Sequence, residues 1–258
     1  MSLSRLLAIA VNVFREVIRD RILYLIGLYG AALLLLATLL PKVAANTQDK
    51  ILLDVGLAAI ALIGLATTIF VGTGLVNKEI ARRTIYVLMA KPVSPVELVV
   101  GKHLGLTAVL GVLVGAMTAI YLLQLSFSGI AYPTGSLLLS AVYTLLELSL
   151  ITAVAILFSV VTSPLLANLL TLAVYLMGQL SPDLIELSKL ADGPTTRLVE
   201  SLYLVLPDLS RLNWRNQAVY GPDLLPEPGV LAGHALYGLL YIAVVLAIAS
   251  GIFSRREF

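Results

Sequence analysis

Glu147 is the residue of this 258-residue chain whose type and position most suggest chemistry. It lies within an apolar stretch, residues 137–180, that is long enough to cross a membrane twice. An ionisable group at that depth is rare, and it marks either a transport path or a polar contact between helices. The chain has no cysteine, so we do not expect thiol catalysis. Its two histidines, His103 and His234, are predicted to lie at opposite sides of the membrane, so we do not expect them to form a metal site.

Two polar faces accompany Glu147 at helical spacing. The pathway candidates on these faces are Ser140, Tyr143, Thr144 and Glu147 in the first helix and Asn168, Thr171, Tyr175 and Gln179 in the second. Polar groups that face lipid without partners cost several kcal/mol. We therefore expect both faces to turn inward, toward each other, a second subunit or a water-accessible path. Glu147 would then act either as a structural carboxyl that ties helices together or as a pathway residue.

The composition excludes a soluble globular protein. Hydrophobic residues make up 59% of the chain and charged residues 12%, whereas a soluble domain carries about 25% charged and roughly 45–50% apolar residues. So little charge cannot cover a water-facing surface. The formal net charge is only +2, which gives no reason to expect a nucleic-acid partner. The sequence therefore predicts an all-α integral membrane protein embedded in a lipid bilayer.

Six transmembrane helices are predicted, because each must supply about 20 mostly apolar residues. They are residues 22–40, 51–76, 104–125, 137–161, 164–180 and 230–253. The fourth and fifth divide at Pro164, since proline disfavours helix at the residue before it. Lys and Arg residues number 11 on one side of this arrangement and 6 on the other, so the positive-inside rule places both termini in the cytoplasm.

Residues 1–21 are predicted to form an amphipathic interfacial helix and not a cleaved signal peptide. Apolar residues recur there at helical spacing, with Arg5, Glu16 and Arg19 on the opposite face. The apolar stretch that follows is longer than a signal-peptide core and starts too late.

A stripe of small residues marks the beginning and middle of the third span. It consists of Gly101, Gly105, Gly111 and Gly115, which fall within about a third of the helix circumference. Small residues let helix backbones approach closely in lipid. We expect this stripe to pack against another helix, either within the bundle or at a seam between subunits.

The segment 77–95 is predicted to contain a cytoplasmic coupling helix. It reads NKEIARRTIYVLMAKPVSP, in which apolar residues lie between charged flanks and the helix stops at Lys91-Pro92. A helix that docks into a groove of a cytoplasmic partner needs such residues. The alternative is that these charges form only a hydrated, positive flank of the spans.

Between Glu79 and Lys102 the order of residues resembles the permease subunits of ABC type-2 transporters: an acidic residue, a basic pair with threonine, an apolar run, Lys-Pro-Val-Ser and then Gly-Lys. The nearest branch includes the permease of the nitrous-oxide-reductase maturation system. The resemblance implies a bacterial inner-membrane protein that pairs with a second permease copy, as a homodimer or a heterodimer, and is driven by a separate ABC ATP-binding subunit. The residues that it implies at the contact with that subunit are Glu79, Arg82, Arg83, Thr84 and Lys91.

Nucleotide-binding machinery is missing from the sequence, because G-x-x-x-x-G-K-[ST] does not occur. The chain is therefore not predicted to be an enzyme or to carry a cofactor, and ATP and Mg²⁺ would bind in the partner subunit. In the resembled permeases, the long loop before the last span holds short re-entrant helices that cap the outer mouth. We expect the same of residues 181–229, which six prolines interrupt.

The function that these features favour is that of a permease which forms the translocation pathway of an ATP-driven exporter. One alternative is a proton-coupled secondary transporter that uses Glu147. Another is ATP-driven mechanical signalling through residues 181–229 to an extracytoplasmic maturation partner, without bulk transport. A catalytic constellation for an intramembrane enzyme is missing from the sequence.

Overall fold

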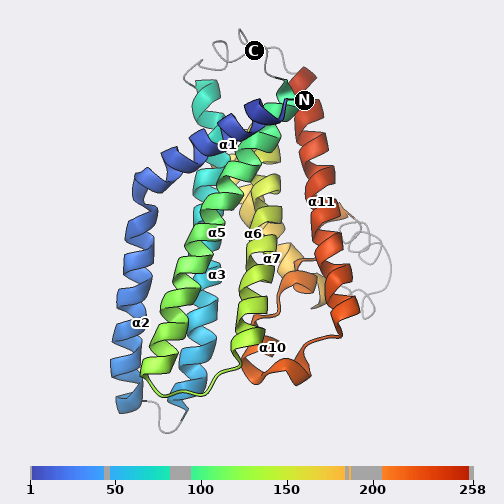
Figure 1. The fold of residues 1–258 in the computed structure, drawn as a ribbon. Helices are drawn as coiled ribbons and strands as arrows, with labels where there is room; N and C mark the ends of the chain where they lie inside the picture. The colour runs from blue at the N-terminus through green and yellow to red at the C-terminus, as the bar shows by residue number, and fades with distance from the viewer. Residues whose placement is uncertain (1, 44–46, 82–93, 184–185, 187–204, 256–258) are drawn as a thin grey trace.

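The chain folds as a bundle of long helices (Figure 1). The computed structural model describes residues 2–43, 47–81, 94–183, 186 and 205–255, and this part of the chain contains no strand. In chain order the elements are α1 (Leu3–Val17), the π-helical turn η1 (Ile18–Ile22), α2 (Leu23–Val43), α3 (Gln48–Ala81), α5 (Pro95–Phe127), α6 (Thr134–Val161), α7 (Pro164–Gln179), the 3-10 turn η2 (Leu209–Leu212), α10 (Arg215–Tyr220), the 3-10 turn η3 (Pro222–Leu224) and α11 (Pro228–Arg255). The predicted all-α membrane fold is confirmed.

Five of the described helices are long and apolar enough to cross a membrane, namely α2, α3, α5, α6 and α11. The fifth predicted span, 164–180, corresponds to α7, whose 16 residues extend only roughly 24 Å. That length falls short of the ~30 Å hydrocarbon core of a bilayer. Figure 1 shows α1 and the last turns of α11 at the same end of the bundle.

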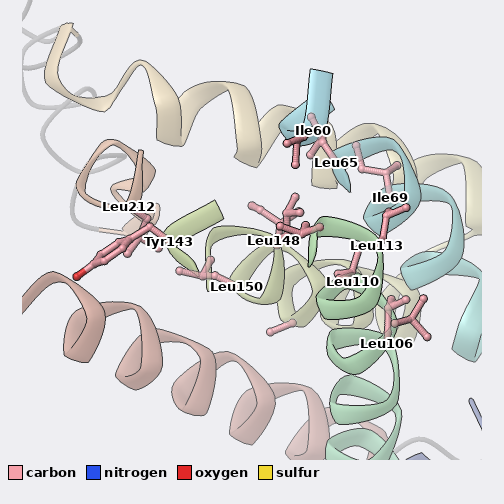
Figure 2. Packing of buried hydrophobic residues seen from close by; sticks show 14 of the residues in the cluster. Ile60, Leu65, Ile69, Leu106, Leu110, Leu113, Tyr143, Leu148, Leu150 and Leu212 are labelled. Atoms are coloured by element: carbon pink, nitrogen blue, oxygen red, sulfur yellow. The ribbon is translucent and has the colours of Figure 1, made fainter. Parts of the chain in front are cut away.

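The central helix is α6, which packs against α3, α5, α7 and α11. Leu148 and Ile151, near its middle, are almost completely buried. Figure 2 shows Leu148 among the leucine and isoleucine side chains of α3 and α5, including Leu110 and Ile60. A helix that is apolar on all sides is expected at such a buried position. By contrast α2, at the edge of the bundle, exposes large apolar side chains such as Leu28 and Leu34, which suits a surface that faces lipid.

The third span starts earlier than the sequence analysis predicts, at Pro95 instead of near residue 104. Ser94 and Glu97 form a capping box, in which each side chain binds the backbone amide of the other residue. Proline at the first helical position adds to this start signal. Since α3 also continues to Ala81, the predicted coupling segment 77–95 overlaps both helices at its ends.

The first helix packs against the bundle and does not stand apart from it. The predicted amphipathic helix, α1, lies across one end of the bundle (Figure 1) and contacts α5 along its length. Leu6, Val13 and Val17 are buried in that contact, while Leu3 and Leu7 remain exposed. The helix therefore has two apolar faces, one against α5 and one available to lipid.

Glycines of the third span allow the close approach of α1 and α5. A Cβ atom on Gly105 would lie 2.7 Å from the carbonyl oxygen of Ala10, and one on Gly101 would lie 2.9 Å from the side chain of Ile9. Gly111 faces α6 at ordinary van der Waals distance, with Leu145 at 3.7 Å, whereas nothing lies within 4 Å of a Cβ on Gly115. The four glycines thus have different neighbours. Gly101 and Gly105 allow the close contact with α1, whereas Gly111 and Gly115 are not needed for it.

Adding one methyl group should therefore have opposite consequences at two positions of the same helix. Gly105→Ala should lower the free energy of unfolding by about 1–3 kcal/mol, because the added carbon meets backbone that cannot move aside. Gly115→Ala, the matched control, should be neutral or stabilising by about 0.5–1 kcal/mol, since alanine favours helix. Thermal unfolding of the purified chain in detergent measures both. Equal effects of the two substitutions would contradict the packing of α1 on α5.

Candidate functional site

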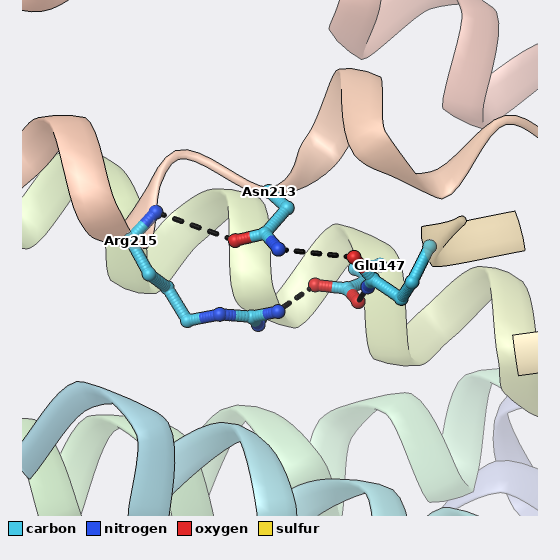
Figure 3. Close-up of polar contacts among 4 residues, drawn as sticks. Glu147, Asn213 and Arg215 are labelled. Atoms are coloured by element: carbon cyan, nitrogen blue, oxygen red, sulfur yellow. Dashed lines mark hydrogen bonds and ion pairs between the residues drawn. The ribbon is translucent and has the colours of Figure 1, made fainter. Parts of the chain in front are cut away.

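Glu147, in the middle of α6, is paired with an arginine that lies far away in sequence. Its side chain is 1% exposed, and its Oε2 atom lies 2.9 Å from Nη1 of Arg215, whose side chain is 12% exposed. Gln179, the last residue of α7, donates its amide to the other carboxylate oxygen, Oε1. Both oxygens of a deeply buried carboxylate are therefore satisfied, as burial of a charge requires. Figure 3 shows this arrangement.

The network continues into the backbone beside Arg215. Asn213 donates its side-chain amide to Oε1 of Gln179 at 3.0 Å, and its own Oδ1 accepts from the backbone N–H of Arg215 at 3.5 Å. Tyr175 lies against the same Arg215 and Gln179 side chains. One polar network thus joins α6, the end of α7 and the start of α10 (Figure 3).

Arg215 belongs to residues 205–227, here called the returning segment, which packs back into the bundle. Leu209, Leu212 and Ala218 within it are fully buried, and α10 contacts α6 and α3. Glu147 lies thirteen residues after Thr134, which is roughly 20 Å along α6. The returning segment therefore reaches to about the middle of the central helix.

The returning segment is held by contacts on both of its sides. Gly178 of α7 permits one of them, because a Cβ there would lie 2.7 Å from the carbonyl oxygen of Pro207. On the α11 side, the hydroxyl of Tyr237 accepts from the backbone N–H of Asp208 at 2.8 Å. The rings of Trp214 and His234 stack with centroids 5.6 Å apart. The segment is thus wedged between α7 and α11.

The predicted polar faces are only partly brought together. Glu147, Tyr175 and Gln179 meet in the network. The remaining five residues have other surroundings. Tyr143 donates to the carbonyl of Leu231 at 2.6 Å, Asn168 accepts from Thr73 at 2.5 Å, and Thr171 donates to the carbonyl of Ala167 at 2.7 Å. Thr144 is buried, and the buried hydroxyl of Ser140 has no partner among the described residues. Within the described part of this single chain, three of the eight predicted residues therefore share one network.

The residues proposed to contact an ATP-binding subunit lie largely outside the described part of the chain. Glu79 falls within α3, but its side chain is outside the described set, and Arg82, Arg83, Thr84 and Lys91 are outside it altogether. Among the described residues no group of three His, Cys, Asp or Glu side chains could hold a metal ion.

No motif or spacing in the sequence marks Arg215 and Asn213 as site residues. A buried carboxylate needs a cation, so a search for the partner of Glu147 would have had to consider every arginine outside the spans. The apolar neighbours Leu209, Leu212 and Ala218 were the one available signal that this arginine lies in a buried segment.

Removing one charge of the pair should destabilise the chain more than removing both. Arg215→Met leaves Glu147 buried and unpaired, so we expect a loss of about 3–5 kcal/mol in the free energy of unfolding. Adding Glu147→Leu should recover most of that loss, because two apolar groups can pack where two charges did. Thermal unfolding in detergent measures the series. A double variant less stable than Arg215→Met would contradict the pairing.

The matched control is Arg211→Met, in the same segment. Arg211 is 42% exposed and pairs with Asp208 at 2.9 Å, so its removal should cost less than about 1 kcal/mol.

Comparison with known families agrees with the architecture. A family described as "ABC-2 family transporter protein" matches residues 7–258, and no significant match was found among curated proteins. Members of this family are membrane transport components that associate with an ATP-binding subunit. Its near-complete match, together with the apolar helical bundle, shows that this chain belongs to the ABC-2 transporter family and is a multi-pass transmembrane subunit of an ABC transporter.

Proposed function

We propose that this chain is the permease of an ATP-driven exporter, in which the Glu147–Arg215 pair holds the returning segment in a closed position. The observation that carries the proposal is this pair, because it fixes a segment at the middle of the central helix through groups that can exchange partners. An apolar plug would be held by packing alone, whereas an ion pair can separate when water enters and solvates both charges. The segment would close the pathway at the end opposite α1.

The energy would come from a separate ATP-binding subunit, which binds ATP and Mg²⁺. Its contact on this chain would be the segment 77–95, with Glu79, Arg82, Arg83, Thr84 and Lys91 at or near the interface. The two helices that bracket this segment, α3 and α5, both pack against α6. A displacement of the segment would therefore reach the helix that carries Glu147.

The assembly would consist of two permease copies and their ATP-binding subunits in a bacterial inner membrane, with the termini of each permease in the cytoplasm. The end of the bundle that holds α1 and the last turns of α11 would then face the ATP-binding subunits (Figure 1). The returning segment would lie toward the other side of the membrane.

A second candidate is ATP-driven signalling to an extracytoplasmic maturation partner, as the resemblance to the nitrous-oxide-reductase maturation branch suggests. Exposed apolar side chains on the returning segment favour it, because Val205, Tyr220 and Leu224 are all more than half exposed and exposed apolar groups of this kind suit a protein contact. The proton-coupled alternative is less well supported, since Arg215 already occupies the carboxylate of Glu147.

Charge reversal in segment 77–95 should separate the chain from its ATP-binding subunit. We expect the subunit to co-purify with the wild-type chain and its recovery to fall about tenfold or more with Arg82→Glu and Arg83→Glu together, because like charges across an interface are strongly unfavourable. The control is Lys50→Glu, an exposed lysine in the first turn of α3. Because α3 begins at the end of the bundle opposite α1 (Figure 1), this reversal should leave recovery unchanged. Pull-down with tagged chain from membranes that contain both subunits measures it. Undiminished recovery in the reversed variant would place the contact elsewhere.

Locking the returning segment should stop the ATP-driven cycle. A Cβ on Gly178 would lie 2.8 Å from Cγ of Leu209, close to the separation of a Cβ and the opposite sulfur in a disulfide. The chain has no cysteine of its own, so the double substitution Gly178→Cys with Leu209→Cys can form only one disulfide within the chain. We expect oxidation to lower ATP turnover of the assembled complex to that of the isolated ATP-binding subunit, and reduction to restore it.

The single cysteine variants under the same oxidant are the controls for the bridge. Gly178→Cys alone also measures the effect of the close approach of its Cβ to the carbonyl of Pro207. If the oxidised, bridged complex hydrolyses ATP at the full rate, the returning segment does not need to move during the cycle. That result would rule out its role as a gate. If the bridge stops turnover only when an outer partner protein is present, the signalling function is favoured instead.

A further inference from the structure

Two buried charges on α5, Glu97 and Lys102, play no part in the Glu147 network. Their residues are 3% and 2% exposed, respectively. Both lie in the first two turns of α5, directly after the segment proposed to contact the ATP-binding subunit. Each of them binds a backbone group of a neighbouring helix, Glu97 of α1 and Lys102 of α3. Their contacts therefore point to a positional role.

Glu97 binds two helices with one carboxylate. Its Oε2 accepts the backbone N–H of Ser94 at 3.0 Å and completes the capping box of α5. A capping box needs no more than this. Its Oε1 accepts the backbone N–H of Ser2 at 2.6 Å, and Ser2 is the N-cap residue of α1. The carboxylate thus ties the beginning of α1 to the beginning of α5.

Lys102 ties the same turn of α5 to α3. Its Nζ atom donates to the backbone carbonyl of Leu75 at 2.5 Å, six residues before α3 ends at Ala81. Between the two charges, Gly101 brings the backbone of α5 against Ile9 and the carbonyl of Leu6. Three helices are therefore joined within two turns of α5, and two of them are the helices that enter and leave the segment 77–95.

We propose that Glu97 and Lys102 are positioning residues that clamp α1, α3 and α5 into one body, so that movement of the segment 77–95 is delivered to the bundle and not lost in bending. The clamp consists of Ser2, Leu75, Ser94, Glu97 and Lys102. This proposal rests on the proposed function, since it concerns how motion from an ATP-binding subunit travels. Without Glu97 the start of α1 separates from α5, and without Lys102 the end of α3 moves independently.

Amide hydrogen exchange, followed by mass spectrometry, tests the clamp in the full chain assembled with its ATP-binding subunit in nanodiscs. In Glu97→Ala we expect exchange at the first amides of α1 to rise about tenfold or more, as loss of a charge-assisted hydrogen bond predicts. Lys102→Met should raise exchange near Leu75 in the same way. The control is Glu16→Ala, an exposed glutamate on α1, which should change neither region.

The same samples, with and without ATP and vanadate, measure transmission. In the wild-type complex we expect nucleotide to change exchange across the returning segment 205–227. In Glu97→Ala that response should be lost while the ATP-binding subunit remains bound. A residue that merely stabilised the fold would lower protection everywhere, and would leave the nucleotide response of the surviving fold intact.

A covalent bridge shows whether the clamp acts by holding helices together. With Ile9→Cys and Gly101→Cys added to Glu97→Ala, oxidation should restore the nucleotide response and reduction should abolish it. A Cβ on Gly101 would lie 2.9 Å from both Cβ and Cγ2 of Ile9. Because the Cβ atoms of a disulfide are usually about 3.5–4.5 Å apart, the bridge holds α1 beside α5 with a small outward shift of α1. The same cysteine pair with Glu97 intact, kept reduced, controls for the substitutions themselves.

The clamp is disproved if the wild-type complex responds to nucleotide and Glu97→Ala responds equally, or if the oxidised bridge protects α1 without restoring the response. A wild-type complex that binds its partner but shows no response to nucleotide would instead contradict the proposed function. The transmitting role of the clamp would then be contradicted together with the proposed function. Exchange at the first amides of α1 would still show whether Glu97 holds α1 to α5.

Discussion

The architecture depends on one constraint, that a charge placed at the middle of a membrane-spanning helix must be neutralised from within the protein. Glu147 lies at such a position on α6, and no cation occurs along α6 or α7 to satisfy it. The cation comes instead from Arg215, so the chain after α7 has to return into the bundle. The depth of the returning segment therefore follows from where the carboxylate is placed.

The short α7 makes room for this return. A helix of full membrane length would fill the space that the buried Leu209 and Leu212 occupy beside α6 and α7. Because α7 ends at Gln179, its final side chain can serve the network, and Gly178 lets the carbonyl of Pro207 approach. Length, terminal residue and glycine position in α7 thus agree with a single purpose, which is to seat the returning segment.

The sequence predicts the helices well because the bilayer imposes a length and a polarity on each one. It also predicts that Glu147 and Gln179 face inward, since lipid does not tolerate them. Arg215 escapes prediction because its burial is a tertiary property, and in the sequence it reads as a loop charge. The early start of α5 escapes for a different reason: Glu97 and Lys102 interrupt the apolar pattern, and only their contacts with Ser94, Ser2 and Leu75 show that they belong inside the fold.

One polar cluster, around Glu97 and Lys102, lies at the end of the bundle that holds α1, and the other, around Glu147, lies at about the middle of α6. Their chemistry differs in a way that suits different tasks. Glu97 and Lys102 bind backbone groups of neighbouring helices, which cannot rotate away, so these bonds favour rigid attachment. Glu147 is held by the side chains of Arg215 and Gln179, which can change rotamer and take new partners. If α3 and α5 move together, α6, which packs against both of them, must respond. The side-chain contacts around Glu147 can then absorb that motion, because the close-packed leucine core around them cannot rearrange as easily.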